Sequence, residues 1–364
     1  MRVLNNKNSP ADRNNATDKS FHRLSRPRRD FYLLGVFAFA LFIACGEKFP
    51  LPPQNVTTNR GIVTDTLYVQ QTPVWGAERN YTFRGPRDVH VGPEPLVYVA
   101  DTGNDRVVML DPVGNVLGSS GRIPHPVAIT QDNQLDLLVV NNTNRVYRIN
   151  LVEANHVIAN ARIDTILTLE QRDRPRWRFT AIAAYFGRSY YVTRTGPETA
   201  DNAIVQFNER DELVGPLPLV PGGTGFFSVT DPSGIISVRR GSIDFIFTQI
   251  GNSFHRAQWI TTDAYGFTPK IEQGKAFYTP GKFMSPEDIA LDDAGNIYVI
   301  DAGSDSLYKF NPAGGEFRSQ SFGGHGAGER QFNQPGGAAW FNKVLYVADT
   351  GNNRIVRFKL NTDL

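Results

Sequence analysis

Two short apolar segments of the sequence are preceded by acidic side chains that could bind a cation. Asp88 stands in front of one segment, and Glu287 and Asp288 stand in front of another. Carboxylate oxygens are the ligands that calcium and similar hard cations prefer. The alternative is structural, because charges at strand ends often cap the backbone or pair with a neighbour such as Arg87. Both interpretations are open from the sequence.

Histidines are too scattered for a catalytic zinc site. Among the five that follow residue 45, only His125 stands in front of a predicted inner strand. A catalytic zinc ion normally keeps three protein ligands, so a single imidazole is insufficient. The sequence also contains no phosphate-binding loop and no Gly-x-Ser-x-Gly turn of serine hydrolases. His125 is therefore a candidate for ligand binding rather than for metal catalysis.

Four arginines alternate with other residues along one segment. They are Arg172, Arg174, Arg176 and Arg178. In an extended chain, side chains two residues apart project to the same side. The spacing therefore predicts a basic strip that could bind an anionic group or an acidic partner. The alternative is a solvated strand edge that charge and proline protect against aggregation.

The composition is that of a globular protein with many turns. Of the 364 residues, 40% are hydrophobic and 20% are charged, and there are 33 glycines and 23 prolines. The formal net charge is +2, but eight basic residues lie in the first 44, so residues 45–364 carry 30 basic and 33 acidic groups. This balance argues against a nucleic-acid partner. We expect the protein to be a monomer.

The amino-terminal region has the pattern of an export signal. Residues 1–30 are polar and basic, and residues 31–44 form a run of 14 without a charge. A membrane-spanning helix needs about 20 apolar residues, so this run suits the short helix of a secretory signal instead. Its end at Ala44-Cys45 resembles a bacterial lipoprotein cleavage site, which implies that residues 1–45 are a signal segment. The alternative is an uncleaved anchor, or a signal peptide whose cysteine is incidental.

The resemblance implies that Cys45 carries lipid, which would anchor the protein stably to a membrane. Residues 46–60 are rich in proline, asparagine and threonine and are predicted to form a flexible tether. By resemblance to lipoprotein sorting, Gly46 favours the outer membrane of a bacterial cell envelope. Cys45 is the only cysteine in the sequence, which excludes an intrachain disulfide and a thiolate zinc cluster. The folded domain is expected to span residues 61–364.

Internal repeats identify the elements that must position the candidate residues. The segment Tyr98–Val108 recurs closely at Tyr346–Val356, and a third copy lies at Tyr298–Leu307. Weaker copies bring the number of units to six. Their equivalent positions are Asp101, Asn141, Arg194, Arg239, Asp301 and Asp349. The mean interval is about 50 residues, which is within the range of propeller blades.

Each unit is predicted to contain four antiparallel strands. In the fifth unit these strands are expected at 288–291, 296–300, 306–310 and 316–322, where apolar runs alternate with turn residues. The last unit lacks an outer strand, and residues 64–70 form an unclaimed strand at the start of the domain. We therefore expect residues 64–70 to pair with residues 354–360 and close a ring.

The repeated turn has its own chemistry. Glycine supplies positive φ in turns, which is the expectation for Gly103, Gly303 and Gly351. An aspartate can accept hydrogen bonds from turn amides, which is the expectation for Asp101, Asp301 and Asp349. These assignments make the repeated residues structural.

The unit resembles the NHL repeat, with its Tyr-Val-Ala-Asp-like second strand, Gly-Asn turn and arginine before the third strand. The resemblance covers about residues 86–360 and implies an all-β, six-bladed propeller whose inner strands line a central channel. It also implies that Arg106, Arg145 and Arg354 hold turns or neighbouring blades. Propellers commonly bind ligands at the mouth of the channel. The candidates there are Arg87, Asp88, His125, Glu287 and Asp288.

The NHL resemblance indicates a fold more firmly than an activity. Similar propellers include protein-binding and RNA-binding modules, a lyase and lactonases, and RNA binding conflicts with an export signal. We interpret the chain as a membrane-anchored, non-catalytic scaffold without a required cofactor, whose ligand is a protein, peptide or glycan. The alternative is an envelope hydrolase, lactonase or lyase that uses a divalent cation, such as calcium, held by Asp88, Glu287 and Asp288.

Overall fold

The computed structural model describes residues 66–238, 243–264 and 266–364 of the chain. The predicted signal segment, Cys45 and the predicted tether lie outside the described residues. Within the described ranges, no helix is long and apolar enough to cross a membrane. The helical elements are short: α2 (Leu169–Asp173) and the 3-10 turns Ala77–Arg79, Thr102–Asn104, Ile158–Asn160, Thr199–Asp201, Ala276–Tyr278, Arg318–Gln320, Thr350–Asn352 and Asn361–Asp363.

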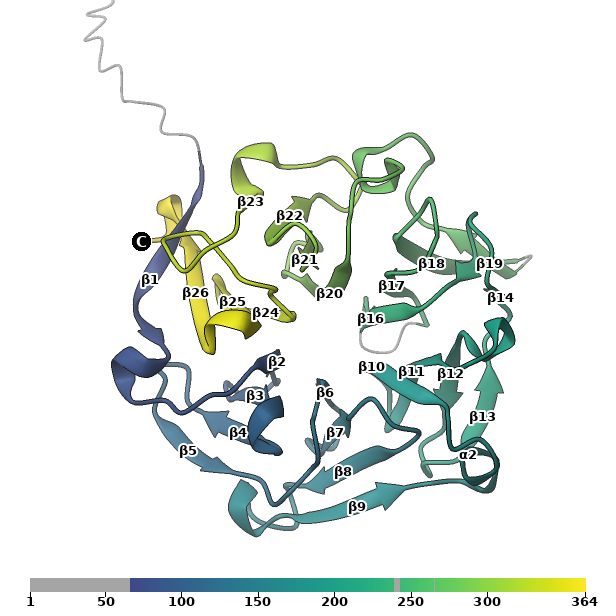
Figure 1. The fold of residues 1–364 in the computed structure, drawn as a ribbon, viewed down its shortest axis with the longest axis horizontal. Coiled ribbons are helices and arrows are strands. Elements are labelled where there is room, and N and C mark those ends of the chain that lie inside the picture. The colour runs from purple at the N-terminus through teal and green to yellow at the C-terminus, as the bar shows by residue number, and fades with distance from the viewer. Residues whose placement is uncertain (1–65, 239–242, 265) are drawn as a thin grey trace, which may run out of the picture. The chain divides into compact units, whose positions relative to one another are not determined.

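Six four-stranded antiparallel sheets form the blades of a ring, which confirms the predicted propeller (Figure 1). Blade 1 contains β2 (Pro86–Val91), β3 (Val97–Asp101), β4 (Arg106–Leu110) and β5 (Val116–Ser119). Blade 2 contains β6 (Ala128–Gln131), β7 (Leu137–Val140), β8 (Val146–Asn150) and β9 (Arg162–Ile166). Blade 3 contains β10 (Arg178–Phe186), β11 (Ser189–Thr195), β12 (Ala203–Phe207) and β13 (Leu213–Pro216).

The second half of the ring follows the same order, from the innermost strand outward. Blade 4 contains β16 (Pro232–Ser237), β17 (Phe245–Gln249), β18 (Ala257–Asp263) and β19 (Gly266–Pro269). Blade 5 contains β20 (Pro286–Leu291), β21 (Ile297–Asp301), β22 (Ser306–Phe310) and β23 (Phe322–Gly323). Blade 6 contains β24 (Gly337–Phe341), β25 (Val344–Asp349), β26 (Arg354–Leu360) and β1 (Tyr68–Trp75). A parallel pair, β14 (Val220–Pro221) and β15 (Ser228–Val229), lies between blades 3 and 4 in the chain.

Hydrophobic side chains fill the interfaces between neighbouring blades. Between blades 1 and 2, for example, Tyr98 and Val107 pack with Leu137 and Ile149, and all four are fully buried. Middle strands such as β3 are buried on both faces, which explains their continuous apolar runs. The core is therefore distributed around the ring, and each blade depends on its two neighbours.

The amino-terminal strand closes the ring, as predicted. β1 pairs antiparallel with β26, with Tyr68 opposite Leu360. The strand lies further along the chain than the predicted 64–70. It ends at Trp75, whose side chain is fully buried. The Tyr68 hydroxyl lies 2.8 Å from the Tyr298 hydroxyl, and the Lys309 ammonium donates to it at 3.2 Å. The closing strand is thus fastened to blade 5 as well as to blade 6.

Two strand predictions were wrong. In blade 4, the alignment of Arg239 with Asp301 implied that the segment before Arg239 is a second strand, but residues 232–237 form the inner strand β16. Pro232 pairs with the last residue of the second strand, as Pro86 does in blade 1, so the apparent turn at Asp231–Gly234 begins a strand. In blade 5, the outer strand is reduced to Phe322–Gly323, because a 3-10 turn occupies part of the predicted 316–322.

The repeated turn requires glycine for a different reason from the one predicted. Positive φ occurs two residues later, at Asp105, Asp305 and Asn353. A Cβ atom on Gly103 would lie 2.6 Å from the Arg84 backbone oxygen, and one on Gly351 would lie 2.7 Å from that of Asn333. Glycine is therefore required for close approach to the preceding loop.

Hydroxyl groups join neighbouring blades around the channel. Thr180 in blade 3 donates to the Pro232 carbonyl of blade 4 at 2.6 Å, and Ser233 in blade 4 donates to the Pro286 carbonyl of blade 5 at 2.5 Å. Thr102 and Thr350 make the same kind of contact with the blade that follows each of them. These bonds fix the starts of the inner strands relative to one another.

Candidate functional site

The inner strands place one residue of each blade at the same level of the channel. By their register against the second strands, these residues are Asp88, Ala128, Ala181, Gly234, Asp288 and Gly337. Four of the six positions hold alanine or glycine, so the two aspartates carry the large side chains at this level. The small residues leave open space next to two carboxyl groups.

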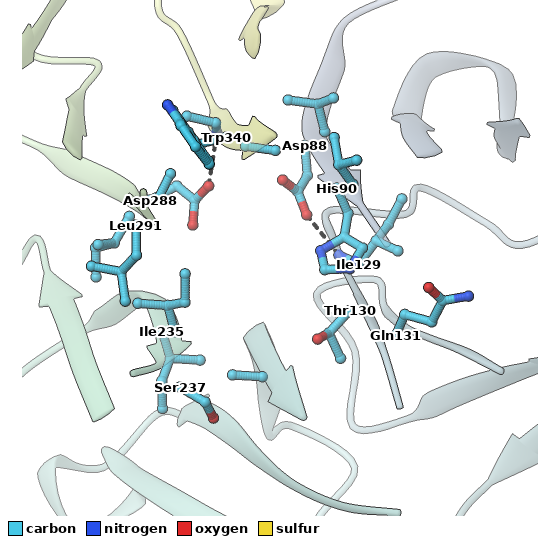
Figure 2. A pocket seen from close by; sticks show the side chains of 18 of the residues that line it. Asp88, His90, Ile129, Thr130, Gln131, Ile235, Ser237, Asp288, Leu291 and Trp340 are labelled. Carbon is cyan, nitrogen blue, oxygen red and sulfur yellow. Dashed lines mark hydrogen bonds between the residues drawn. The ribbon is translucent and has the colours of Figure 1, made fainter. Parts of the chain in front are cut away.

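Asp88 and Asp288 each reach the inner strand of the next blade. Oδ2 of Asp88 accepts a hydrogen bond from the Ile129 backbone N–H at 2.7 Å, and Oδ2 of Asp288 accepts one from Ala338 at 2.9 Å. Figure 2 shows the two carboxyl groups pointing toward each other across the pocket. Asp88 is 7% exposed, and Asp288 is partly buried. The pair therefore faces a shared space from blades 1 and 5.

Two glycines allow neighbouring strands to approach these aspartates. A Cβ atom on Gly337 would lie 2.6 Å from Oδ1 of Asp88, and one on Gly234 would lie 2.9 Å from the Cα atom of Asp288. Both separations are too short for any larger residue without a shift of the backbone. Blades 6 and 4 thus hold the aspartates in place from behind.

The environment of the pair favours the protonated carboxyl. Loss of hydration raises the pKa of Asp88 to about 7, against the opposing effect of the Ile129 hydrogen bond. Loss of hydration also raises the pKa of Asp288 well above its ordinary value, and the negative charge of Asp88 raises it further. Near neutral pH the pair therefore retains at least one proton and can both donate and accept hydrogen bonds.

A cavity of about 400 Å³ extends from the two aspartates to the other end of the inner strands, and all six inner strands line it. Its polar lining includes side chains that we did not identify from the sequence: His90, Thr130, Gln131 and Ser237 (Figure 2). The two-residue period of a strand was the available signal for His90, because it follows Asp88 by two positions. The volume is that of a site for a small molecule.

The other three candidates for ligand binding at the channel mouth do not line this cavity. They are Arg87, His125 and Glu287. The Arg87 guanidinium forms an ion pair with Oε2 of Glu287 at 2.9 Å, and both residues line a second cavity of about 510 Å³, together with His125. Glu287 therefore pairs with Arg87 and does not join the two aspartates. Among the described residues, no group of three or more histidine, cysteine or acidic side chains could hold a metal ion. The predicted set of Asp88, Glu287 and Asp288 is not assembled into one metal site.

The four alternating arginines do not form the predicted strip. The expectation of an extended segment was wrong, because helix α2 begins at Leu169 and contains Arg172. Arg174 instead lies over the Trp177 ring, with 5.9 Å between the guanidinium carbon and the ring centroid. Arg172 and Arg178 line a hollow of about 700 Å³ between blades 2 and 3. Arg176 is exposed and lies outside the lining of this hollow.

No family model matches the chain, and no curated protein matches its sequence. Solved structures share the fold at low sequence identity. A protein of unknown function from Bacteroides thetaiotaomicron is 15% identical, with a TM-score of 0.57, over 82% of this chain and 77% of that one. A gluconolactonase from Xanthomonas campestris is 10% identical, with a TM-score of 0.54, over 81% and 97% of the two chains. The calcium-binding protein regucalcin from Agrobacterium tumefaciens is 11% identical, with a TM-score of 0.54, over 79% and 94%.

Proposed function

We propose that the propeller binds a small polar molecule in its central channel, with Asp88 and Asp288 as the principal contacts. The observation that carries this proposal is the pair of facing carboxyl groups beside a cavity of about 400 Å³. Ionisable groups with strongly shifted pKa values concentrate at functional sites. The wall of alanine and glycine around the pair supports the same conclusion, because it leaves room for a ligand.

The ligand is a hydroxylated or amine-bearing molecule. A pair that holds one proton can donate to a hydroxyl oxygen through one carboxyl and accept from a hydroxyl group through the other. An amine would replace the shared proton and form charge-assisted hydrogen bonds. Binding of an amine would therefore release protons, whereas binding of a neutral polyol would not.

Hydrolysis of an ester or lactone in the same cavity is the second candidate function. The specific observation is the pKa of about 7 for Asp88, which suits a general base at neutral pH. The fold is compatible with this chemistry, since a gluconolactonase from Xanthomonas campestris has it. The residues do not fit the calcium-dependent form of this candidate. Calcium takes six to eight oxygen ligands, and Glu287 is held by Arg87 instead.

We also propose that the protein belongs to the cell envelope as a lipoprotein with NHL-type repeats. The support is the sequence pattern alone: a short apolar run before Cys45, then a proline-rich segment. In this proposal Cys45 carries the lipid, and the propeller acts as a monomer at the outer membrane. Metabolic labelling with an alkyne fatty acid tests it. Label on the wild type but not on Cys45→Ala is expected, and an unlabelled wild type contradicts it.

The channel proposal can be tested by ligand-induced stabilisation of the purified full-length protein. A panel of small amines, polyols and lactones is added, and calorimetry then measures heat and proton release for those that raise the melting temperature. Asp88→Asn and Asp288→Asn are expected to weaken binding about tenfold or more, because each loses a charge-assisted contact. Glu78→Gln is the matched control, since Glu78 is exposed, lies in the 3-10 turn after the outer strand β1 and does not line the cavity.

The same variants separate binding from catalysis. If a lactone is hydrolysed, loss of a general base at Asp88 lowers the rate about a hundredfold or more. Binding without turnover supports the scaffold function. Ligands that bind the two aspartate variants and Glu78→Gln as tightly as they bind the wild type would contradict a site at this pair.

A further inference from the structure

We propose that the hollow between blades 2 and 3 is a binding site for an acidic saccharide, separate from the channel cavity. We name it the basic hollow and define it by Arg145, Arg172 and Arg178, which line it. Its remaining lining consists of His125, Asn141, Asn142, Thr143, Asn144, Leu167 and Pro175. No acidic side chain is among these lining residues, although they include three guanidinium groups. The site therefore presents uncompensated positive charge to a ligand.

Arg145 has lost the partner that its counterparts have. In blades 1 and 6, the arginine before the third strand donates through Nε to the aspartate at the end of the second strand, at 2.8 Å for Arg106–Asp101 and 2.7 Å for Arg354–Asp349. In blade 2 the aspartate is replaced by Asn141, whose side chain donates to the Pro124 carbonyl instead. Among the residues that the structure describes, Arg145 forms no ion pair. Its side chain is exposed at the basic hollow.

Helix α2 carries Arg172, a second arginine in the lining of the basic hollow. A capping box fixes the start of the helix, with the Thr168 N–H donating to Oε1 of Gln171 at 2.6 Å. The Asn144 side chain donates to the Gln171 carbonyl at 2.6 Å and so ties the turn of blade 2 to this helix. Arg145 and Arg172 are therefore carried by two segments that are hydrogen-bonded to each other. This arrangement fixes the backbone positions from which the two arginines reach the hollow before a ligand binds.

Arg178 adds a third cation whose position is also fixed. One terminal nitrogen of its guanidinium donates to the carbonyls of Pro175 and Trp177, at 3.2 and 2.9 Å. These contacts neutralise no charge, because a carbonyl is uncharged. Nε and the second terminal nitrogen of Arg178 form no hydrogen bond with another of the described residues. Arg178 can therefore contact an anion while its backbone contacts hold it in place.

The lining chemistry favours a sugar acid over an acidic protein. Guanidinium groups bind carboxylates in a bidentate manner, and the amides and hydroxyl of Asn142 and Thr143 suit sugar hydroxyl groups. Protein interfaces are enriched in aromatic anchors, whereas His125 is the one aromatic ring in the lining. The volume of about 700 Å³ accommodates a few sugar rings. His125 and Asn142 also line the second cavity, the one that Arg87 and Glu287 line, so a longer saccharide could extend from the basic hollow into it.

The test measures binding of a trigalacturonate and of the neutral galactose trisaccharide to the full-length protein by calorimetry at low salt. The uronate is expected to bind and the neutral sugar to bind at least tenfold more weakly. Arg145→Gln and Arg172→Gln should each weaken uronate binding about tenfold, because each removes one charge-assisted contact. The triple variant with Arg178→Gln should lose binding. Arg176→Gln is the matched control, since that exposed arginine lies outside the hollow.

Several outcomes would overturn the proposal. Equal weakening by Arg176→Gln would mean that general surface charge attracts the uronate. Equal binding of the neutral trisaccharide would remove the role of the carboxylate, and tighter binding of a short polyglutamate would assign the hollow to an acidic protein instead. Inorganic phosphate that binds as tightly as the uronate would show that the sugar hydroxyls contribute nothing. Melting curves confirm that each variant is folded before its affinity is interpreted.

Discussion

The turn after the second strand is built in two ways around the ring. In blades 1, 5 and 6 it contains Asp101, Asp301 and Asp349, all fully buried. Each accepts a hydrogen bond from a backbone N–H of the loop that precedes the inner strand. In blades 2, 3 and 4 the register places other residues there, namely Asn141, Arg194 and Gln249. The structural role is constant, but the chemistry that performs it is not.

Those substitutes hold the same loop by other contacts. Asn141 donates to the Pro124 carbonyl at 2.9 Å, and Gln249 accepts from the Thr230 N–H at 2.8 Å. Arg194 lies over the ring of Trp177, with 3.9 Å from the guanidinium carbon to the ring centroid. Where the aspartate is retained in blades 1 and 6, it also neutralises an arginine. In blade 2, where the aspartate is replaced by Asn141, Arg145 is released from this contact and becomes part of the lining of the basic hollow.

The largest expected effect tests how much the closing strand contributes to the stability of blade 6, which has the aspartate form of the turn. Trp75 belongs to β1, fills the interface between blades 6 and 1, and is fully buried. Trp75→Ala should lower the free energy of unfolding by about 3–5 kcal/mol, since it leaves a large cavity. Urea denaturation measures this, with the exposed Phe186→Ala as the control. A loss below about 1 kcal/mol would show that blade 6 does not depend on the closing strand.

The second prediction compares the two kinds of turn directly. Asp349→Ala removes a buried carboxylate and leaves Arg354, which is 12% exposed, without its partner. We expect a loss of about 3 kcal/mol. Asn141→Ala removes a neutral hydrogen bond and should cost about 1 kcal/mol. Equal losses in urea denaturation would mean that the charged turn is no stronger than its neutral substitute.

The third prediction concerns Asp88, an aspartate that occurs outside the repeated turn. Its pKa is raised to about 7 in the folded protein, so the native state binds this proton more tightly than the unfolded state does. The contribution of Asp88 to stability should therefore be greatest below about pH 4 and fall as the pH rises toward 7, by up to about 1.4 kcal/mol per pH unit. Asp88→Asn keeps an acceptor for the Ile129 N–H and removes the titration.

Melting temperatures of the wild type and of Asp88→Asn, measured between pH 4 and pH 8, check this. The variant should be the more stable protein at pH 8, by up to about 4 kcal/mol, and the difference should vanish near pH 4. Parallel pH profiles for the two proteins would contradict a raised pKa at Asp88.

The smallest expected effect compares Arg106, which pairs with an aspartate, with Arg145, which does not. Arg106→Gln leaves the buried Asp101 without a cation, and we expect a loss of about 1 kcal/mol. Arg145→Gln should change the free energy of unfolding by less than about 0.5 kcal/mol, because its side chain is exposed and unpaired among the described residues. A larger cost at Arg145 would assign it a structural role after all.

The sequence predicted the fold because repetition is visible without coordinates. Three close copies of one unit indicated six blades, and the missing outer strand of the last unit indicated closure by an earlier strand. The prediction failed in blade 4, where Asp231–Gly234 looks like a turn but begins β16. A single unit cannot decide between these alternatives. The pairing of β16 with β17 shows that this segment is a strand, and the sequence pattern does not reveal that pairing.

The candidate site was predicted in part. Asp88 and Asp288 were identified from their positions in front of strands, but their separation from Glu287 was not. That separation depends on Arg87, which reaches Glu287 from blade 1 across 200 residues of sequence. The basic hollow was not predicted either, because the sequence pattern predicted a basic strip that did not include Arg145. Its arginines come from two segments that only the packing of blades 2 and 3 brings together, and the alternating pattern suggested one straight strand instead.

The position of β1 has a mechanical consequence. Any pull on the chain ahead of Tyr68 is transmitted first to the hydrogen bonds between β1 and β26, before it reaches another sheet. The strand pair β1–β26, which closes the ring, is thus also the part of the fold that resists this force. Its strength, including the tyrosine and lysine contacts to blade 5, sets the force at which the whole ring opens.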